Sequence, residues 1–182
     1  TASRLAKEKH IDWLVKAVIE AHKELPELTF DIYGSGGEDS LLREIIANHQ
    51  AEDYIQLKGH AELSQIYSQY EVYLTASTSE GFGLTLMEAI SSGLPLIGFD
   101  VPYGNQTFIE DGKNGYLIPS SSDHVEDQIK KAYAEKICQL YLENRLEGMR
   151  EKSYQIAESF LTQEILNTWE ETIKEVVDDS VI

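Results

Sequence analysis

Residues 79–89 read SEGFGLTLMEA and join an expected strand to an expected helix. Gly81 and Gly83 flank Phe82 in this turn, and glycine allows the backbone to come close to a ligand. The first amides of a helix lack partners within the helix, and the positive end of the helix dipole favours phosphate or sugar oxygens. The segment therefore indicates a strand–turn–helix unit that binds an oxygen-rich ligand. The alternative interpretation of the same residues is the start of a helix with acidic side chains that binds no ligand.

Two carboxylates, Glu80 and Glu88, lie in this segment. With Glu80 in the turn and Glu88 in the helix, a rise of ~1.5 Å per residue separates them by roughly 12 Å along the axis. Glycoside hydrolases hold their two carboxyl groups about 5 to 9.5 Å apart across one bond. The spacing thus favours contacts to separate parts of an elongated ligand over an acid–base pair.

Strand and helix patterns alternate along the chain on both sides of this segment. Expected helices cover 11–19, 41–50, 63–70, 83–92 and most of the chain from 121 onward; expected strands cover 28–32, 54–58, 72–76, 94–99 and 115–118, with a turn-rich loop at 102–114. Strands that alternate with helices are joined by parallel crossovers. We therefore expect an α/β fold with a doubly wound, mainly parallel, Rossmann-like sheet covered on both faces.

The pattern divides the chain into two parts. Residues 1–160 are expected to form the Rossmann-like domain, and residues 161–182 a helical C-terminal extension. An apolar stripe runs along that extension at helical spacing and consists of Ile165, Leu166, Trp169, Ile173 and Val176. We expect this stripe to pack back on the domain or on a further N-terminal domain, because the chain opens directly into a motif-like stretch at Thr1.

Charge and composition exclude several classes of function. The 182 residues carry a formal net charge of −17, which repels a phosphate backbone, so no nucleic acid partner is expected. Any phosphate must then bind at a small local site. The single cysteine, Cys138, excludes an internal disulfide and fits a cytoplasmic location. No apolar run approaches the ~18 residues that span a bilayer.

Cations and a glycine turn precede the central segment. Arg4, Lys7 and Lys9 lie where a first strand is expected to end, and an Arg and a Lys that converge there would neutralise a diphosphate. A solvated basic patch is the alternative. The glycine turn at 34–37 follows the next strand, but Asp39 occupies the place of the third glycine in a dinucleotide fingerprint. This disfavours a nicotinamide-dependent oxidoreductase.

Neither a cofactor nor a metal is expected. The chain has no Asp-x-Asp triplet, no Walker P-loop, no nucleophile elbow and no cysteine-based zinc motif. Its histidines form no close ligand pair, and we expect structural or surface roles for them: His10, His22, His49, His60 and His124.

Taken together, the segments resemble the C-terminal domain of the retaining glycosyltransferases of GT-B fold, the family 4-like group. Four features agree in order: Ser3-Arg4-Leu5 with Glu8-Lys9, the glycine turn at 34–37, Leu57-Lys58-Gly59, and the Glu-x7-Glu segment that leads to Gly93-Leu94-Pro95. The likeness covers nearly the whole chain. It implies the donor-binding half of such an enzyme, whose acceptor side belongs to a missing N-terminal domain. We therefore expect this chain alone to be inactive.

The resemblance implies a role for each matching position. Arg4 and Lys9 are implied to bind the donor diphosphate, and Glu88 the ribose. Glu80 is the implied catalytic-site residue that positions the donor sugar, together with the residues after it: Gly81, Phe82, Gly83 and Leu84. The base is implied to lie beside Gly34, Ser35, Gly36 and Lys58.

A finer likeness involves residues 100–106 and 109–117. These look like the accessory-secretion glycosyltransferases of streptococci, which transfer N-acetylglucosamine from UDP-GlcNAc to serine and threonine of serine-rich adhesins. They are also similar to poly(glycerol-phosphate) α-glucosyltransferases. The former group implies a related non-catalytic partner subunit and a cytoplasmic enzyme, peripheral at the membrane in the complex. A non-catalytic partner or chaperone domain on the same fold is the other alternative.

Overall fold

The computed structural model describes residues 1–79, 81–119 and 126–179. Within these ranges the strands are β1 (Phe30–Tyr33), β2 (Ile55–Gly59), β3 (Tyr73–Leu74), β4 (Leu96–Asp100) and β5 (Gly115–Pro119). The α-helices are α1 (Ile11–His22), α2 (Asp39–Asn48), α3 (Leu84–Ser91), α4 (Gly104–Phe108), α5 (Glu126–Leu142), α6 (Leu146–Glu158) and α7 (Thr162–Asp179). Two short 3-10 turns, η1 (Lys7–Lys9) and η2 (Tyr67–Gln69), complete the described elements.

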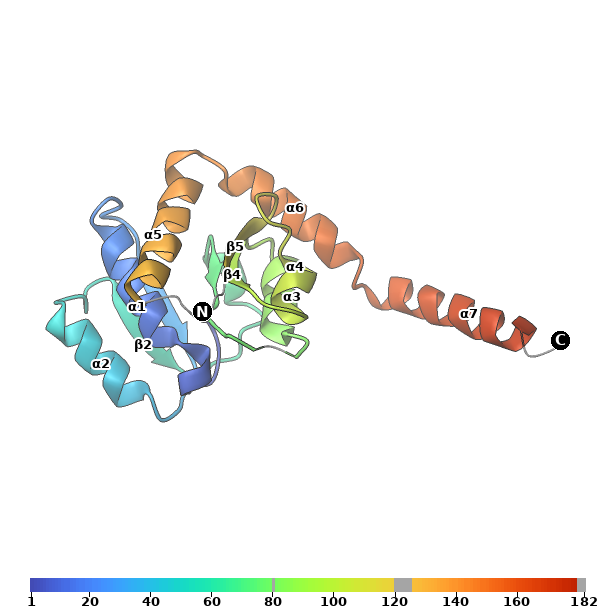
Figure 1. The fold of residues 1–182 in the computed structure, drawn as a ribbon, viewed down its shortest axis with the longest axis horizontal. Coiled ribbons are helices and arrows are strands. Elements are labelled where there is room, and N and C mark those ends of the chain that lie inside the picture. Colours follow the sequence, from blue (N-terminus) through green and yellow to red (C-terminus); the bar gives the residue numbers. More distant parts are fainter. Residues whose placement is uncertain (80, 120–125, 180–182) are drawn as a thin grey trace.

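The strands form two parallel sheets with helices on both faces (Figure 1). One sheet has the order β1-β2 and the other β3-β4-β5, and all three strand pairs are parallel. Helices α1, α2 and α5 pack together on one face, and α3, α4 and α6 on the other. Apolar side chains fill both layers, and each layer forms its own buried cluster. The expected α/β fold with parallel strands is confirmed.

The first residues of the chain hold the two sheets together. Ser3 donates its amide to the Tyr33 carbonyl oxygen (3.0 Å), and Tyr33 donates to the carbonyl oxygen of Thr1 (3.0 Å), which are the bonds of a parallel ladder beside β1. On the other side, the Tyr73 hydroxyl in β3 donates to the carbonyl oxygen of Ala2 (2.8 Å). Residues 1–3 thus lie where the sequence predicts the end of a first strand.

The segment 63–70 is not the α-helix that its periodicity predicts. It contains the 3-10 turn η2, and the following strand β3 is also shorter than the expected 72–76. Isolated helices of this length are marginal, so tertiary contacts decide the conformation. Here the Tyr70 hydroxyl donates to Asp31 (2.6 Å) and the Tyr67 hydroxyl to Glu88 (2.9 Å), which ties the turn to two different elements.

Helix α4 lies within the stretch that the sequence predicts as a loop. It follows Tyr103, whose φ of 67° places a bulky residue in the left-handed region. The buried Asn105 amide donates to the carbonyl oxygen of Phe99 (2.8 Å), and the Thr107 hydroxyl donates to that of Tyr103 (2.7 Å). Side-chain bonds, rather than apolar periodicity, therefore stabilise this short helix.

Helix α7 extends away from the rest of the molecule (Figure 1). Its start at Thr162 agrees with the expected helical character of the extension. The large apolar side chains along it are exposed: Ile165, Leu166, Trp169 and Ile173. Its packing on another domain stays a prediction. Among the described residues, no helix combines the length and apolar character needed to cross a bilayer.

Candidate functional site

The turns that follow β1 and β2 meet the start of the chain at one edge of the sheets. The Leu5 amide donates to the Ser35 carbonyl oxygen (2.9 Å), and the Glu38 amide donates to that of Leu5 (3.0 Å). Gly34 donates to the carbonyl oxygen of Gly59 at the end of β2 (2.8 Å). In open parallel α/β sheets, ligands bind outside the carboxyl ends of the strands. The structure therefore brings the first two predicted motifs together at the expected edge.

Gly34 and Gly36 allow this close approach. A Cβ atom built on Gly34 would lie 1.8 Å from the Ser3 carbonyl oxygen, and one on Gly36 would lie 2.3 Å from that of Leu5. Any side chain at these positions would displace the backbone that carries Arg4. The family resemblance implies a base-binding turn here, which stays a prediction, whereas the structure shows that its glycines have a packing role.

The two cations at this edge belong to one short segment. The Arg4 side chain is 76% exposed, and its Nη2 lies 3.0 Å from Glu8 Oε1. Exposed ion pairs contribute only about 0–1 kcal/mol, so Arg4 can exchange Glu8 for a phosphate at little cost. Lys9 ends η1, and the next residue, His10, turns the chain in the left-handed region with φ of 46°. The His10 ring stacks on Trp13, with 3.8 Å between centroids, and burial lowers the His10 pKa.

Helix α3 begins at the candidate ligand turn. Gly83 precedes it with φ of 86°, and its carbonyl oxygen accepts the amides of Leu86 (2.9 Å) and Met87 (3.2 Å). Gly83 has no side chain to cap the first amides of α3, so these N–H groups can donate hydrogen bonds to a ligand oxygen. Phe82 and Leu84 are 50% and 62% exposed beside this helix end. Glu80 lies outside the described residues.

Glu88 is exposed on α3, one turn after Leu84. Its Oε2 accepts a hydrogen bond from the hydroxyl of Tyr67 in η2 (2.9 Å). The motifs do not include Tyr67 as a partner of this candidate residue, because 21 positions separate it from Glu88 in the sequence. The sequence signal for such a contact was the pair of tyrosines at positions 67 and 70, whose hydroxyl groups can form hydrogen bonds.

Lys58 is held on the surface of the β1-β2 sheet. Its Nζ donates to Gln56 Oε1 (3.0 Å) and lies 3.4 Å from Asp31 Oδ2. Tyr70 also donates to Asp31, and the Tyr33 and Tyr70 hydroxyls are 2.8 Å apart. Lys58 thus has partners of its own, and its implied place beside a base stays a prediction.

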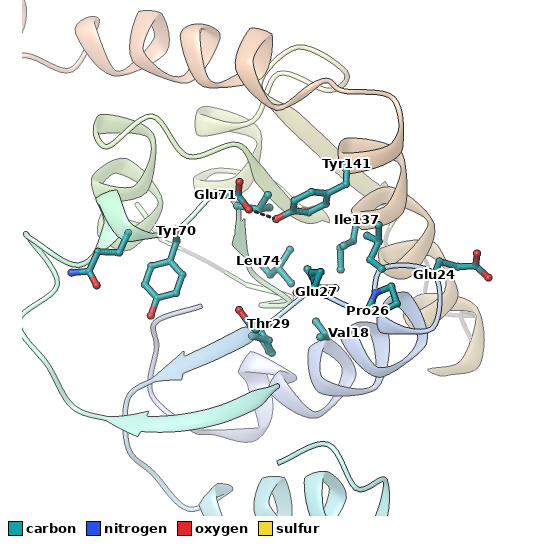
Figure 2. Close-up of a pocket in the computed structure, with 15 residues that line it drawn as sticks. Val18, Glu24, Pro26, Glu27, Thr29, Tyr70, Glu71, Leu74, Ile137 and Tyr141 are labelled. Carbon is teal, nitrogen blue, oxygen red and sulfur yellow. Dashed lines mark hydrogen bonds between the residues drawn. The ribbon is translucent and has the colours of Figure 1, made fainter. Parts of the chain in front are cut away.

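A cavity of about 450 Å³ lies elsewhere, between α1, α5 and the starts of β1 and β3 (Figure 2). Thr29 and Val72 line it at the amino ends of these strands, and Val18 and Ile137 reach it from the two helices. The acidic side chains Glu24, Glu27 and Glu71 also belong to its lining, and Tyr141 donates to Glu71 (3.2 Å). None of the described candidate residues lines this cavity, and its acidic groups oppose the binding of a diphosphate.

Within the described residues, no cluster of three or more His, Cys, Asp or Glu side chains could hold a metal ion. The positive groups of the candidate edge are Arg4, Lys9 and the amides that start α3. This arrangement suits a ligand that carries phosphate at one place and hydroxyl groups at another.

Comparison with known proteins agrees with this geometry. Residues 1–155 match the family model described as "Glycosyl transferases group 1". The chain belongs to this family. A relative in Streptococcus pneumoniae serotype 4, the UDP-N-acetylglucosamine–peptide N-acetylglucosaminyltransferase GtfA subunit, is 90% identical over 179 residues, which are 98% of this chain.

Two solved structures give the same fold. The crystal structure of the pneumococcal O-GlcNAc transferase GtfA in complex with UDP and GlcNAc is 90% identical, with a TM-score of 0.91 over 97% of this chain and 35% of that one. A crystal structure of a GtfA/B complex has 65% identity and a TM-score of 0.92 over 98% of this chain and 35% of that one. The family and its GT-B fold confirm the resemblance predicted from the motifs. The chain spans about a third of the length of these relatives (36% of the pneumococcal one).

The close approach of Gly34 to Ser3 allows us to predict how a substitution at Gly34 changes the stability of the fold. Gly34→Ala should lower the free energy of unfolding by more than about 1 kcal/mol, because the new Cβ meets backbone and φ is 135°. Gly37→Ala is the matched control, since nothing lies within 4 Å of a Cβ there, and it should stay within about 0.5 kcal/mol of the parent. Urea unfolding followed by circular dichroism measures both. Equal stability of the two variants would contradict the packing role.

Proposed function

We propose that this chain is the donor-binding domain of a retaining glycosyltransferase that takes N-acetylglucosamine from UDP-GlcNAc and transfers it to serine or threonine of a protein acceptor. The observation that carries this proposal is the 90% identity to a UDP-N-acetylglucosamine–peptide N-acetylglucosaminyltransferase subunit over 98% of the chain. The complex of a 90% identical protein with UDP and GlcNAc supports the choice of donor. Cations and a free helix start at one strand edge fit the same ligand.

The proposed contacts divide the donor into four parts. Arg4 and Lys9 bind the diphosphate, and Glu88 accepts hydrogen bonds from the ribose hydroxyls. Glu80 and the turn 81–84 hold the sugar, in part through the amides at the start of α3. The base lies beside the turn 34–36 and Lys58. The charge of the diphosphate is offset by cations and helix amides, so no metal is needed.

Transfer needs more than this chain. The acceptor and the groups that act on it are proposed to lie on an N-terminal GT-B domain, and the exposed stripe of α7 offers apolar surface for packing on that domain. A related non-catalytic subunit is the proposed partner, supported by the GtfA/B complex of a 65% identical protein. We place the full-length enzyme in the cytoplasm, peripheral at the membrane in that complex, with serine-rich adhesins as acceptors.

Donor binding without a metal tests the proposal directly. The chain should bind UDP with the same affinity in the presence and absence of a chelator, and it should transfer no sugar to an acceptor peptide. Arg4→Ala and Lys9→Ala should each weaken the binding of UDP by roughly tenfold or more, because a hydrogen bond to a charged group contributes about 1.5–3 kcal/mol. Titration calorimetry measures binding, and radiolabelled donor measures transfer. Loss of binding with chelator would assign the phosphates to a metal, and transfer by the chain alone would place the acceptor site within it.

Substitution of Glu80 and substitution of Glu88 should have different effects on the binding of UDP and UDP-GlcNAc. Glu88→Gln should weaken the binding of UDP and of UDP-GlcNAc to the same extent, because the Glu88 carboxylate is proposed to bind the nucleotide. Glu80→Gln should weaken only UDP-GlcNAc, because its carboxylate addresses the sugar. Calorimetric dissociation constants for both ligands and both variants give the comparison. Equal losses for UDP in the two variants would show that the carboxylates share one site or only stabilise the fold.

A further inference from the structure

We propose that Tyr67 is a positioning residue for Glu88, so that the turn η2 determines how tightly the ribose hydroxyls are bound. This inference rests on the proposed function, in which Glu88 accepts hydrogen bonds from the ribose. It assigns a role to a tyrosine that lies on a different element from every residue of the four motifs.

The hydrogen bond joins a buried donor, Tyr67, to an exposed acceptor, Glu88. Tyr67 is 4% exposed, and its ring packs within the buried cluster that contains Leu86 and Ile90 of α3. Its hydroxyl lies 2.9 Å from Glu88 Oε2. An exposed glutamate samples several rotamers, and fixing a side chain of this kind on binding costs about 0.5–1.5 kcal/mol. A buried tyrosine that already holds one oxygen removes part of that cost before the ligand arrives.

The hydroxyl of Tyr67 keeps its proton at neutral pH. Burial raises the Tyr67 pKa, and the neighbouring Tyr73 and the hydrogen bond to Glu88 raise it further. Tyr67 is therefore a donor to the carboxylate. A carboxylate has two oxygens and about four acceptor positions, and Tyr67 takes one of them on Oε2. The remaining positions suffice for the two hydroxyl donors of a ribose.

Separate hydrogen bonds link the turn η2 to two other elements. Tyr70, just after η2, donates its hydroxyl to Asp31 on β1 (2.6 Å). Tyr67 reaches α3 on the other side. Tyr70 therefore offers a matched control: it belongs to the same turn, loses the same atom in a Phe variant, and has a partner other than Glu88.

The test measures by calorimetry the affinities for UDP and for 2′,3′-dideoxy-UDP, which lacks both ribose hydroxyls. The proteins compared are the parent, Tyr67→Phe, Tyr70→Phe, Glu88→Gln and the Tyr67→Phe/Glu88→Gln double variant. Tyr67→Phe should weaken UDP by roughly threefold to tenfold and leave dideoxy-UDP unchanged. Tyr70→Phe should leave UDP within about twofold of the parent. The double variant should bind UDP as Glu88→Gln does, because the tyrosine acts through the carboxylate.

Four outcomes would overturn the inference. Equal weakening of UDP and dideoxy-UDP by Tyr67→Phe would mean a general structural effect, and so would additive losses in the double variant. Unchanged UDP affinity in Tyr67→Phe would mean that Glu88 needs no support. A parent chain that fails to bind UDP would overturn the proposed function and this inference with it, whereas the other three results would leave the proposed function standing.

Discussion

The candidate site depends on the close contact between two backbone segments, the start of the chain at residues 3–5 and the glycine turn after β1. Carbonyl oxygens of Ser3 and Leu5 occupy the space where side chains of Gly34 and Gly36 would lie. The same N-terminal residues bond to β1 on one side and to Tyr73 of β3 on the other. The glycine contact therefore sets the backbone position of Arg4, and the residues just before Arg4 link the two sheets.

Charge explains why this edge, rather than the large cavity, suits a diphosphate. The chain carries a net charge of −17, so a phosphate is repelled by most of its surface. Arg4, Lys9 and the helix start offer positive groups locally, whereas Glu24, Glu27 and Glu71 line the cavity at the opposite ends of the strands. Size alone would favour the cavity as a ligand site. Chemistry favours the carboxyl ends of the strands, where ligands of parallel α/β folds bind.

Sequence patterns predicted most of the fold because apolar periodicity reports burial on one face of an element. That signal located α2, α3 and the buried strand β4 to within about two residues, and it ended α1 about three residues early. It failed at 63–70, where two tyrosine hydroxyls with distant partners replace a helix by a turn, and at α4, whose stability comes from Asn105 and Thr107 side chains. The motifs named Glu88 but not Tyr67, because a hydrogen bond across 21 residues leaves no local pattern.

In the proposed function, the nucleotide binds at the glycine turn and the start of α3. Hydrogen–deuterium exchange of this chain, with and without saturating UDP, tests it most directly because each amide reports its own protection. We expect slower exchange at residues 34–37 and 84–87, with no change at residues 27–29 and 71–72, which line the cavity. Protection at the cavity residues together with unchanged exchange at the two turns would contradict it.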